Sequence, residues 1–194
     1  MSKILIVYGT GYGQTERVAQ RIATVLNVSG HTVNAVKGDR LPKDLSLGDY
    51  DAFIVAASVQ YGRHQAYIRA LVREHIVRMN TAPSAFVSVC GAMAGSAPDG
   101  ARVAQEYVDR FLRETGWRPW AVQSFAGGLP YRRYGVLVRL MMKFISRRTG
   151  RPTDTSRDYD FTDWAMVEQF ARELSTLLRF PAHEPVAAGS PPLE

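Results

Sequence analysis

The chain begins with a short apolar strand that leads directly into a glycine loop and then into a helix. Residues 4–8 are an unbroken run of Ile, Leu, Val and Tyr, which is typical of a strand buried on both faces of a parallel sheet. Residues 9–14 contain three glycines, and from Thr15 to Leu26 apolar residues recur at helical spacing. This order predicts an α/β protein whose first loop lies at the carboxyl edge of a parallel sheet.

Strands and helices continue to alternate along the chain. Short apolar runs predict further strands at residues 32–36, 51–57, 84–90 and 121–126. Helical patterns follow at residues 66–79, 101–115 and 162–178, the last with Thr162 as its cap. We therefore predict a doubly wound five-stranded parallel sheet in the order 2-1-3-4-5. Its ligand should lie between the ends of the first and third strands.

The length of 194 residues suits one domain with an insertion. We expect this domain to span residues 1–178, with a disordered tail rich in Pro, Ala, Gly and Ser at residues 179–194. Residues 127–161 are too many for a simple connection between the fifth strand and the last helix. They form the predicted insertion.

The balance of charges is the unusual part of the composition. Lysine and arginine number 24 against 18 acidic residues, a net charge of +6, so we expect an anionic partner. The single cysteine, Cys90, excludes an internal disulfide, and with four histidines we predict no metal site. No apolar run is long enough to span a membrane, and the first residues do not resemble a signal peptide. We therefore expect a cytoplasmic protein.

The first loop has the features of a phosphate-binding cradle. Its glycines let the backbone curl so that several N–H groups converge at the start of a helix. The spacing matches neither the P-loop nor the dinucleotide fingerprint, and a glycine turn that binds nothing is the alternative. The predicted ligand-binding residues of this loop are Thr10, Gly11, Tyr12, Gly13, Gln14 and Thr15.

Two further loops follow the third and fourth strands and should lie beside the first. We expect Tyr61 to stack on a flat aromatic ligand, or else to pack on the next helix in an ordinary surface loop. His64 is expected to be a solvated histidine, and Cys90 a buried residue at the strand end. The predicted ligand-binding residues are Ser58, Val59, Gln60, Tyr61 and Gly62 in one loop and Cys90, Gly91, Ala92 and Met93 in the other.

Three loops of this kind in this order resemble the flavodoxin family, whose ligand is FMN. In that family the first loop is usually Ser/Thr-x-Thr-Gly-x-Thr. Thr10, Gly13 and Thr15 match this pattern, and Tyr12 replaces the middle threonine. Flavodoxins usually hold the flavin ring between two aromatic side chains. The resemblance implies a flavodoxin-like fold and FMN as cofactor, with Tyr61 on one face of the ring and the other face open.

The insertion is strongly basic and contains an amphipathic helix. No acidic residue occurs at residues 116–153, and residues 135–148 show helical periodicity with a basic stripe of Arg139, Lys143 and Arg147. The broad apolar face consists of Val136, Leu137, Leu140, Met141, Phe144 and Ile145. Such a helix is typical of attachment to an anionic membrane surface. The alternative is that its apolar face packs on the domain or on a second subunit.

Several longer motifs resemble the flavodoxin-like, quinone-dependent protoporphyrinogen dehydrogenases. They are Ala126-Gly127-Gly128-Leu129-Pro130-Tyr131-Arg132-Arg133-Tyr134 and residues 57–62, 79–86, 153–155 and 159–164. The resemblance implies an FMN-dependent enzyme of haem biosynthesis that takes hydrides from protoporphyrinogen IX and passes the electrons to a membrane quinone, typically menaquinone. It also implies a peripheral protein on the inner face of the cell membrane.

The start of the insertion suits a substrate that carries propionate groups. Arginine binds carboxylates through paired hydrogen bonds, so Arg132 and Arg133 are predicted substrate-binding residues. Tyr131 and Tyr134 are predicted to pack on pyrrole rings of the substrate. The sequence shows no convincing general base, so no catalytic residue is predicted.

Other functions stay open at this point. The main alternative is an FMN-dependent quinone or small-molecule reductase on the same scaffold. A flavodoxin-type electron carrier is disfavoured because carriers are usually acidic. Nucleic-acid binding is not expected, because the basic residues lie on an apolar helix and do not alternate with stacking aromatics on a sheet. The sequence does not decide whether the protein forms a homo-oligomer.

Overall fold

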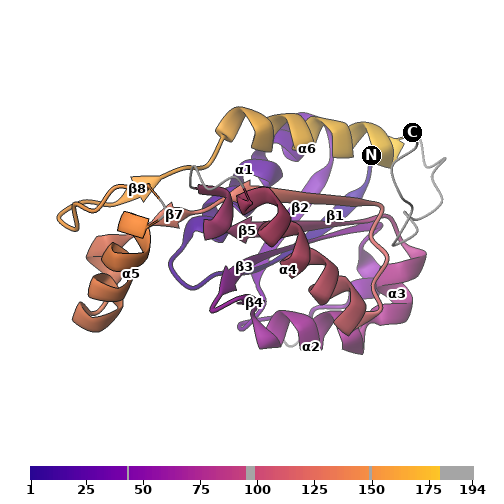
Figure 1. The fold of residues 1–194 in the computed structure, drawn as a ribbon. Helices are drawn as coiled ribbons and strands as arrows, with labels where there is room; N and C mark the ends of the chain where they lie inside the picture. The colour runs from indigo at the N-terminus through magenta and orange to yellow at the C-terminus, as the bar shows by residue number, and fades with distance from the viewer. Residues whose placement is uncertain (43, 95–98, 149, 180–194) are drawn as a thin grey trace, which may run out of the picture.

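The computed structural model describes residues 1–42, 44–94, 99–148 and 150–179. The centre of the molecule is a sheet of five parallel strands in the order β2-β1-β3-β5-β6 (Figure 1). Because β4 is only a short extra strand, this is the predicted order 2-1-3-4-5, and the doubly wound fold is confirmed. The strands are β1 (Lys3–Gly9), β2 (Thr32–Lys37), β3 (Ala52–Gln60), β5 (Ser84–Cys90) and β6 (Ala121–Ala126).

Helices cover both faces of this sheet (Figure 1). Each layer of helices buries its own apolar cluster against the strands. One face carries α1 (Gln14–Val28) and α6 (Trp164–Arg179), and the other carries α2 (Ala66–Glu74), α3 (Ile76–Thr81) and α4 (Gly100–Thr115). Apart from Arg179, the tail that was predicted to be disordered lies outside the described residues.

β1 shows why the strands are apolar without a break. Successive side chains of a strand point to opposite faces, so Ile4 and Ile6 join the cluster under α1 and α6. Leu5 and Val7 join the cluster under α2, α3 and α4. A strand covered by helices on both sides therefore has no polar face.

Two predicted boundaries are wrong, one at the end of the third strand and one in the helix that follows it. β3 continues past residue 57 to Gln60, because residues 59 and 60 pair with the short antiparallel strand β4 (Arg63–His64). The predicted helix at residues 66–79 is broken at His75, where the backbone leaves the helical region (φ −110°, ψ 23°). Leu71 before the break and Met79 after it are both buried in the same apolar cluster.

The last helix begins later than predicted. α6 starts at Trp164, and the carboxylate of Asp163 accepts a hydrogen bond from the Met166 N–H (3.0 Å) in the first turn. Asp163 is therefore the cap. Thr162 is buried instead, and its hydroxyl donates to the carbonyl oxygen of Ala126 (2.9 Å) at the end of β6.

The insertion forms a small lobe at the carboxyl edge of the sheet (Figure 1). Its helix confirms the predicted helical insertion before the last helix. The lobe consists of the two-stranded ribbon of β7 (Gly128–Leu129) and β8 (Tyr159–Asp160), the 3-10 turn η3 (Tyr131–Arg133) and the helix α5 (Val136–Arg148).

Tyr131 is the centre of this lobe. Its side chain is fully buried beside Leu129 and Tyr134. The Tyr131 hydroxyl is hydrogen-bonded to the Ser146 hydroxyl (2.7 Å) and to the Pro152 carbonyl oxygen (2.9 Å). The residue predicted to pack on a pyrrole ring therefore holds α5 against the rest of the insertion.

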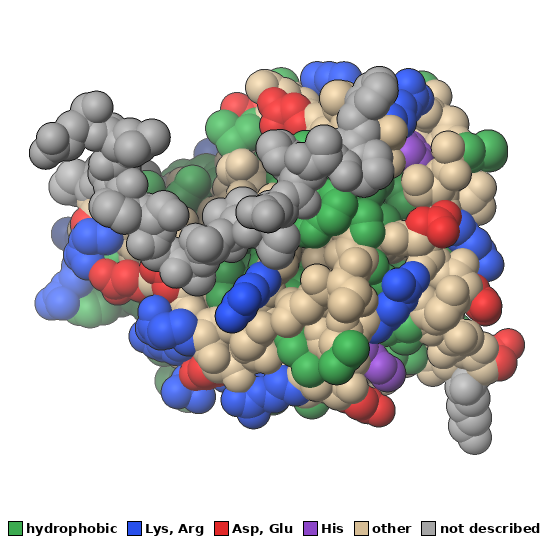
Figure 2. Space-filling model, turned by 90° about the vertical axis from the view of Figure 1, so that its right-hand side faces the viewer, with side chains coloured by type: hydrophobic (Ala, Val, Ile, Leu, Met, Phe, Trp, Pro, Cys, Tyr) green, Lys and Arg blue, Asp and Glu red, His purple; other side chains and the backbone are tan. Residues whose placement is uncertain are grey.

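The far end of the molecule presents mixed charges. Figure 2 views the end opposite the insertion, where Lys and Arg side chains lie scattered between acidic, apolar and other residues.

Within the described part of the chain, no helix has the length and hydropathy needed to cross a bilayer. The same residues contain no group of three or more His, Cys, Asp and Glu arranged to hold a metal ion.

His64 on β4 is buried, so the expectation of a solvated histidine is wrong. Its ring contacts the rings of Phe86 and Phe111, with centroids 5.2 Å and 5.1 Å away. Its Nε2 lies 3.0 Å from the hydroxyl oxygen of Ser88. Burial, with a smaller contribution from the charge of Arg69, lowers the pKa of His64 to about 4, so the imidazole is neutral at pH 7.

Replacing His64 with Gln is expected to make folding less sensitive to acid. The unfolded chain binds the histidine proton below a pH of about 6.5, whereas the folded protein binds it only near pH 4. The free energy of unfolding therefore falls as the pH drops through this window, by up to about 3 kcal/mol. Urea unfolding at about pH 7 and pH 4.5 should show a smaller loss for His64→Gln than for the wild type.

The half-buried His75 offers the control, because it lies outside this aromatic cluster. His75→Gln should leave the His64 contribution in place. Equal losses of stability in the wild type and His64→Gln would show that His64 is not held neutral by burial.

Candidate functional site

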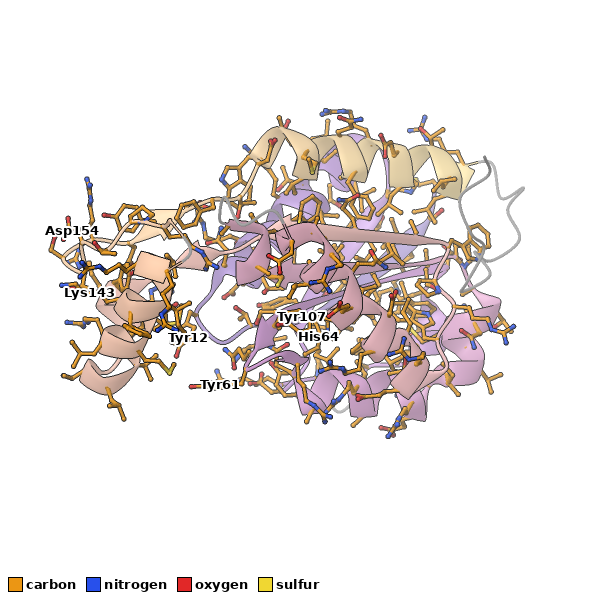
Figure 3. The ribbon with its side chains drawn as sticks, viewed as in Figure 1. Tyr12, Tyr61, His64, Tyr107, Lys143 and Asp154 are labelled. Carbon is orange, nitrogen blue, oxygen red and sulfur yellow. The ribbon has the colours of Figure 1, made fainter. Side chains whose placement is uncertain are left out.

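The carboxyl ends of β1, β3 and β5 and the insertion enclose a cleft of about 430 Å³. Parallel pairing places Gly9 opposite Ala57 and Ser58 opposite Val89, so the three strands end at one edge. Figure 3 shows Tyr12 and Tyr61 projecting from this edge on the side of α5. The predicted cofactor-binding residues that line the cleft are Thr10, Tyr12, Gly13, Gln14, Thr15, Ser58, Val59, Gln60, Tyr61 and Gly91.

The first loop presents unused hydrogen-bond donors to this cleft. Gly13 has a positive φ of 93°, and its N–H donates to the Thr10 hydroxyl (2.8 Å). No side chain of the described residues caps the start of α1, so the N–H groups of its first turn are available to bind an anion. The Thr15 hydroxyl lines the cleft and is fully buried, with no hydrogen-bond partner among the described residues. A buried polar atom of this kind indicates a ligand that completes its hydrogen bonding.

Gly11 shapes the first loop without lining the cleft. The side-chain amide of Gln60 occupies the space where a Cβ on Gly11 would lie. A larger residue at position 11 would require the Gln60 side chain to move. The predicted contact of Gly11 with the ligand is therefore replaced by a packing role.

The second loop is a two-residue hairpin turn between β3 and β4. Both turn residues have positive φ, 49° at Tyr61 and 76° at Gly62, which is the geometry of a type I′ turn. The Tyr61 side chain is 84% exposed at the mouth of the cleft, not packed on a helix. Gly62 does not line the cleft, and its carbonyl accepts a hydrogen bond from Arg110 (3.2 Å).

The third loop offers backbone to the cleft through Gly91. Cys90 is buried as predicted, and its sulfur accepts a hydrogen bond from the Ala92 N–H (3.3 Å). Burial raises the pKa of the Cys90 thiol, so it stays protonated and unreactive at neutral pH. Ala92 and Met93, which were predicted to bind the ligand, do not line the cleft.

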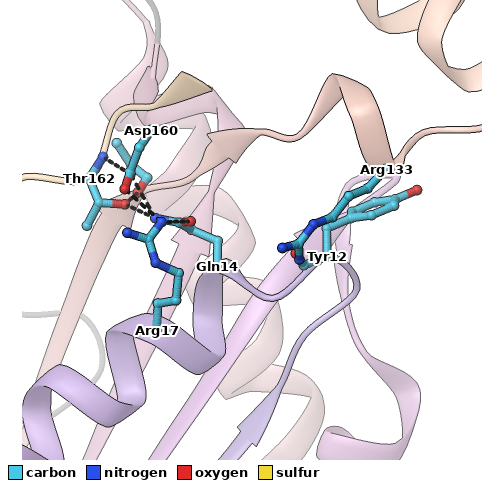
Figure 4. A network of polar contacts seen from close by, with 7 residues as sticks. Tyr12, Gln14, Arg17, Arg133, Asp160 and Thr162 are labelled. Atoms are coloured by element: carbon cyan, nitrogen blue, oxygen red, sulfur yellow. Dashed lines mark hydrogen bonds and ion pairs between the residues drawn. The ribbon is translucent and has the colours of Figure 1, made fainter. Parts of the chain in front are cut away.

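The insertion is joined to the first loop by a polar network that the sequence did not predict (Figure 4). The Gln14 amide donates to the carboxylate of Asp160 (2.8 Å) and to the Thr162 hydroxyl (2.7 Å). Arg17 donates to the second carboxylate oxygen of Asp160 (2.9 Å). The start of α1 is therefore held by the end of the insertion.

Asp160 stays ionised in this network. Burial alone would raise its pKa, but hydrogen bonds from Thr162 and the charge and hydrogen bond of Arg17 outweigh it, and the pKa lies below its usual value. The carboxylate therefore keeps its negative charge at neutral pH and can accept from both Gln14 and Arg17.

Arg133 reaches the first loop from the other end of the insertion. Its guanidinium donates to the Tyr12 carbonyl oxygen (2.6 Å), and the Tyr12 ring meets Tyr134 edge to face at 4.8 Å. Burial raises the pKa of Tyr134. Arg132 is exposed outside the cleft, and its backbone N–H donates to Asp158 (2.9 Å). Of the four predicted substrate-binding residues, the structure brings Arg133 and Tyr134 to the cleft, and leaves Arg132 and Tyr131 out of it.

Several cleft residues were not predicted to bind a ligand. One group lies on α5 or just after it, where helical spacing alone does not say which side chains turn toward the cleft: Val138, Met141, Met142, Ile145 and Arg151. The others lie on α1, on β5 and at the two ends of the insertion: Arg17, Val89, Gly127, Gly128, Leu129, Pro130, Asp158, Tyr159 and Asp160. Met141 and Ile145 were predicted only as parts of an apolar face.

The comparisons with known proteins agree with this fold. Residues 5–156 match the family model of a flavodoxin domain. The protoporphyrinogen IX dehydrogenase (quinone) of Escherichia coli strain K12 is 33% identical over 175 residues, which cover 90% of this chain and 96% of that protein. The protein of the same name from Leishmania major is 31% identical over 179 residues, 90% of this chain and 75% of that one.

Solved flavodoxin structures are similar in fold. Oxidised flavodoxin 1 of Bacillus cereus superimposes with a TM-score of 0.55 at 16% identity, covering 90% of this chain and 98% of that one. A cysteine-to-serine mutant of the flavodoxin from Pseudomonas aeruginosa gives 0.54 at 16% identity, covering 91% and 99%.

The matched flavodoxin domain identifies the cofactor as FMN, and the cleft residues fit this group. The uncapped start of α1 and the buried, unpartnered Thr15 hydroxyl suit a phosphate. The exposed Tyr61 ring suits a flat aromatic ring. The volume of the cleft is in the usual range for a cofactor site.

Arg133→Ala is expected to weaken FMN binding, whereas Arg132→Ala is not. Arg133 holds the first loop through the Tyr12 carbonyl, and Arg132 makes no side-chain contact with that loop. A charged but exposed hydrogen bond contributes about 1 kcal/mol, or roughly a fivefold change in Kd. Fluorescence titration of the apoprotein with FMN measures the difference. Equal Kd values for the two variants would show that Arg133 does not position the loop.

Proposed function

Because this chain belongs to the flavodoxin domain family and, within it, to the quinone-dependent protoporphyrinogen IX dehydrogenases, we propose that it oxidises protoporphyrinogen IX to protoporphyrin IX. It is an oxidoreductase whose cofactor is FMN. The proposed electron acceptor is a membrane quinone, menaquinone, and the proposed role of the reaction is haem biosynthesis.

The apolar side chains that the insertion adds to the cofactor cleft carry this proposal. Val138, Met141, Met142 and Ile145 line the cleft opposite the loops of the sheet. Protoporphyrinogen IX is large and mainly apolar, so it requires an apolar surface beside the flavin. A small electron carrier exchanges electrons at an exposed ring edge and does not require one.

We propose that Thr10, Thr15 and the first N–H groups of α1 bind the phosphate of FMN, and that Tyr61 stacks on the ring. When bound, FMN supplies the hydride acceptor. Gly91 gives the ring access to backbone groups of the third loop. Five predicted cofactor-binding residues do not line the cleft, and we propose that they contribute to the shape of the loops without contacting FMN: Gly11, Gly62, Cys90, Ala92 and Met93.

Substrate binding is proposed for the insertion side of the cleft. Tyr134 is almost fully buried, but its side chain lines the cleft beside Tyr12, where it can pack on a pyrrole ring. Arg133 also lines the cleft while holding the Tyr12 carbonyl. Its remaining N–H groups are placed to meet a propionate at the entrance.

Met141→Glu is expected to impair oxidation of protoporphyrinogen at least tenfold in kcat/KM without loss of FMN. The change puts a charge on the apolar side of the cleft, where desolvating a carboxylate opposes binding of an apolar substrate. The measurement is an anaerobic assay of the FMN-loaded protein with protoporphyrinogen IX and a menaquinone analogue, followed by porphyrin fluorescence.

Met166→Glu is the matched control, because Met166 on α6 lies outside the cleft and is 44% exposed against 41% for Met141. It should behave like the wild type. No porphyrin formation by the wild type, together with rapid reduction of small quinones, would favour the alternative of a quinone or small-molecule reductase.

The outer face of α5 supports a proposal about location. Four residues of the predicted apolar face, Val136, Leu137, Leu140 and Phe144, lie outside the cleft and are exposed, from 56% at Phe144 to 81% at Leu137, so they do not pack on the domain. The other two, Met141 and Ile145, line the cleft. Lys143, Arg147 and Arg148 on the same helix are also exposed. We propose that α5 attaches the protein to an anionic membrane, at the inner face of the cell membrane, where the quinone is dissolved.

Arg139, one member of the predicted basic stripe, is hydrogen-bonded within the insertion. The Arg139 guanidinium donates to the carbonyl oxygens of Tyr131 (2.9 Å) and Tyr134 (3.0 Å). Arg139 therefore holds η3 against α5 and does not form part of a stripe with Lys143 and Arg147. The positive charges of α5 that are available to a membrane are those of Lys143, Arg147 and Arg148.

The double variant Leu137→Asp with Leu140→Asp is expected to lose most membrane binding. It places two charges on the face that would enter the lipid, at a cost of several kcal/mol. Co-sedimentation with vesicles of neutral and of anionic lipid measures the binding, which should increase with anionic lipid and decrease with salt.

Val28→Asp with Val77→Asp is the control, since these valines are equally exposed on helices elsewhere. The control should sediment like the wild type. If the wild type does not sediment with anionic vesicles and instead dimerises through α5, a second subunit covers this face and the membrane proposal is wrong.

A further inference from the structure

Arg151 is a charged residue of the cleft whose side chain has no partner among the described residues. Its Nη1 lies 3.7 Å from the position that a Cβ on Gly91 would occupy, beside the third loop. Its Nε is buried without a hydrogen-bond partner among the described residues. Its backbone N–H donates to the Ser146 carbonyl oxygen (2.9 Å) at the end of α5, which fixes where the side chain starts.

The other charged residues at the cleft already make hydrogen bonds or ion pairs within the protein. Arg17 pairs with Asp160, and Arg133 donates to the Tyr12 carbonyl. Asp158 accepts the backbone N–H of Arg132. In the part of the chain that the structure describes, Arg151 alone among these cations has neither an ion pair nor a side-chain hydrogen bond.

The place of Arg151 in the sheet topology separates it from the phosphate site. Gly91 follows β5, Thr10 follows β1, and β3 lies between these strands. Adjacent strands are about 4.8 Å apart, so the two loops are about 10 Å apart across the edge. A cation at the third loop is thus too far from the first loop to bind the phosphate, and when FMN is bound it would face the ring side of the cofactor.

We propose that Arg151 stabilises the negative charge that the flavin ring acquires on reduction. A hydride transferred from the substrate breaks a C–H bond, forms an N–H bond on the ring and brings two electrons with one proton. The ring, neutral before the transfer, then carries one negative charge, while the oxidised substrate releases its N–H proton to water. A guanidinium cation that has no other partner in the described part of the chain attracts the reduced ring more than the oxidised ring.

The consequence is a higher midpoint potential for bound FMN. Tighter binding of the reduced form relative to the oxidised form makes the flavin a better hydride acceptor. Arg151 thus acts as a positioning charge for the cofactor, and no role in holding the substrate is required. The inference depends on FMN alone, and it stands whether or not protoporphyrinogen IX is the substrate.

The test compares the midpoint potential of FMN in the wild type, Arg151→Gln and Arg151→Lys, by reductive titration without porphyrinogen or quinone. Arg151→Gln should lower the affinity for reduced FMN relative to oxidised FMN at least tenfold, which corresponds to a fall of about 30 mV. Arg151→Lys keeps the charge and should retain most of the potential. The reduced flavin of Arg151→Gln should also ionise at a higher pH, visible in its absorbance spectrum.

Arg118→Gln is the control for the loss of one charge, because Arg118 is exposed just before the amino end of β6, at the edge of the sheet opposite the cleft. Its potential should equal that of the wild type. The proposal is wrong if Arg151→Gln leaves the potential unchanged. If in that case the KM for porphyrinogen rises and esterified substrate removes the difference, Arg151 binds a substrate carboxylate. If affinity for both forms of FMN falls equally, Arg151 only supports the fold of the cleft.

Discussion

Parallel pairing of β1, β3 and β5 is the constraint on which the site depends. Strands that run in the same direction end at the same edge, so loops that are about 30 and 50 residues apart in the chain become neighbours. The strands are apolar on both faces and covered by helices, so packing on both sides fixes where they end. A cleft built there needs little side-chain chemistry of its own. Glycine turns and the free N–H groups of α1 provide most of it.

The insertion turns this general cofactor edge into a deeper cleft. It has its own small core around Tyr131, and it is joined to the first loop at both ends, through Asp160 and through Arg133. Loss of the insertion would therefore disturb the first loop, because Gln14 and the Tyr12 carbonyl would lose their partners.

Arginines serve several different purposes in this small region. Arg139 satisfies carbonyl groups within the lobe, Arg133 holds the first loop, and Arg17 pairs with Asp160. Among the described residues, Arg151 has no such partner. A count of charges therefore does not reveal which arginines are already hydrogen-bonded within the protein.

The sequence by itself determined the fold, the three loops and the helix of the insertion. Unbroken apolar runs require burial on both faces, and the glycines in residues 9–14 mark the loop after β1. These are local patterns, in which each residue type follows from its own neighbours along the chain. Only the tertiary structure decided that His64 is buried, that Thr162 binds the sheet instead of capping α6, and that Tyr131 and Arg132 lie outside the cleft. Each of these outcomes depends on a contact with residues distant in sequence, such as Phe111 for His64 and Ala126 for Thr162. Arg132 and Arg133 are adjacent and chemically identical, so only the direction in which η3 turns them separates one from the other.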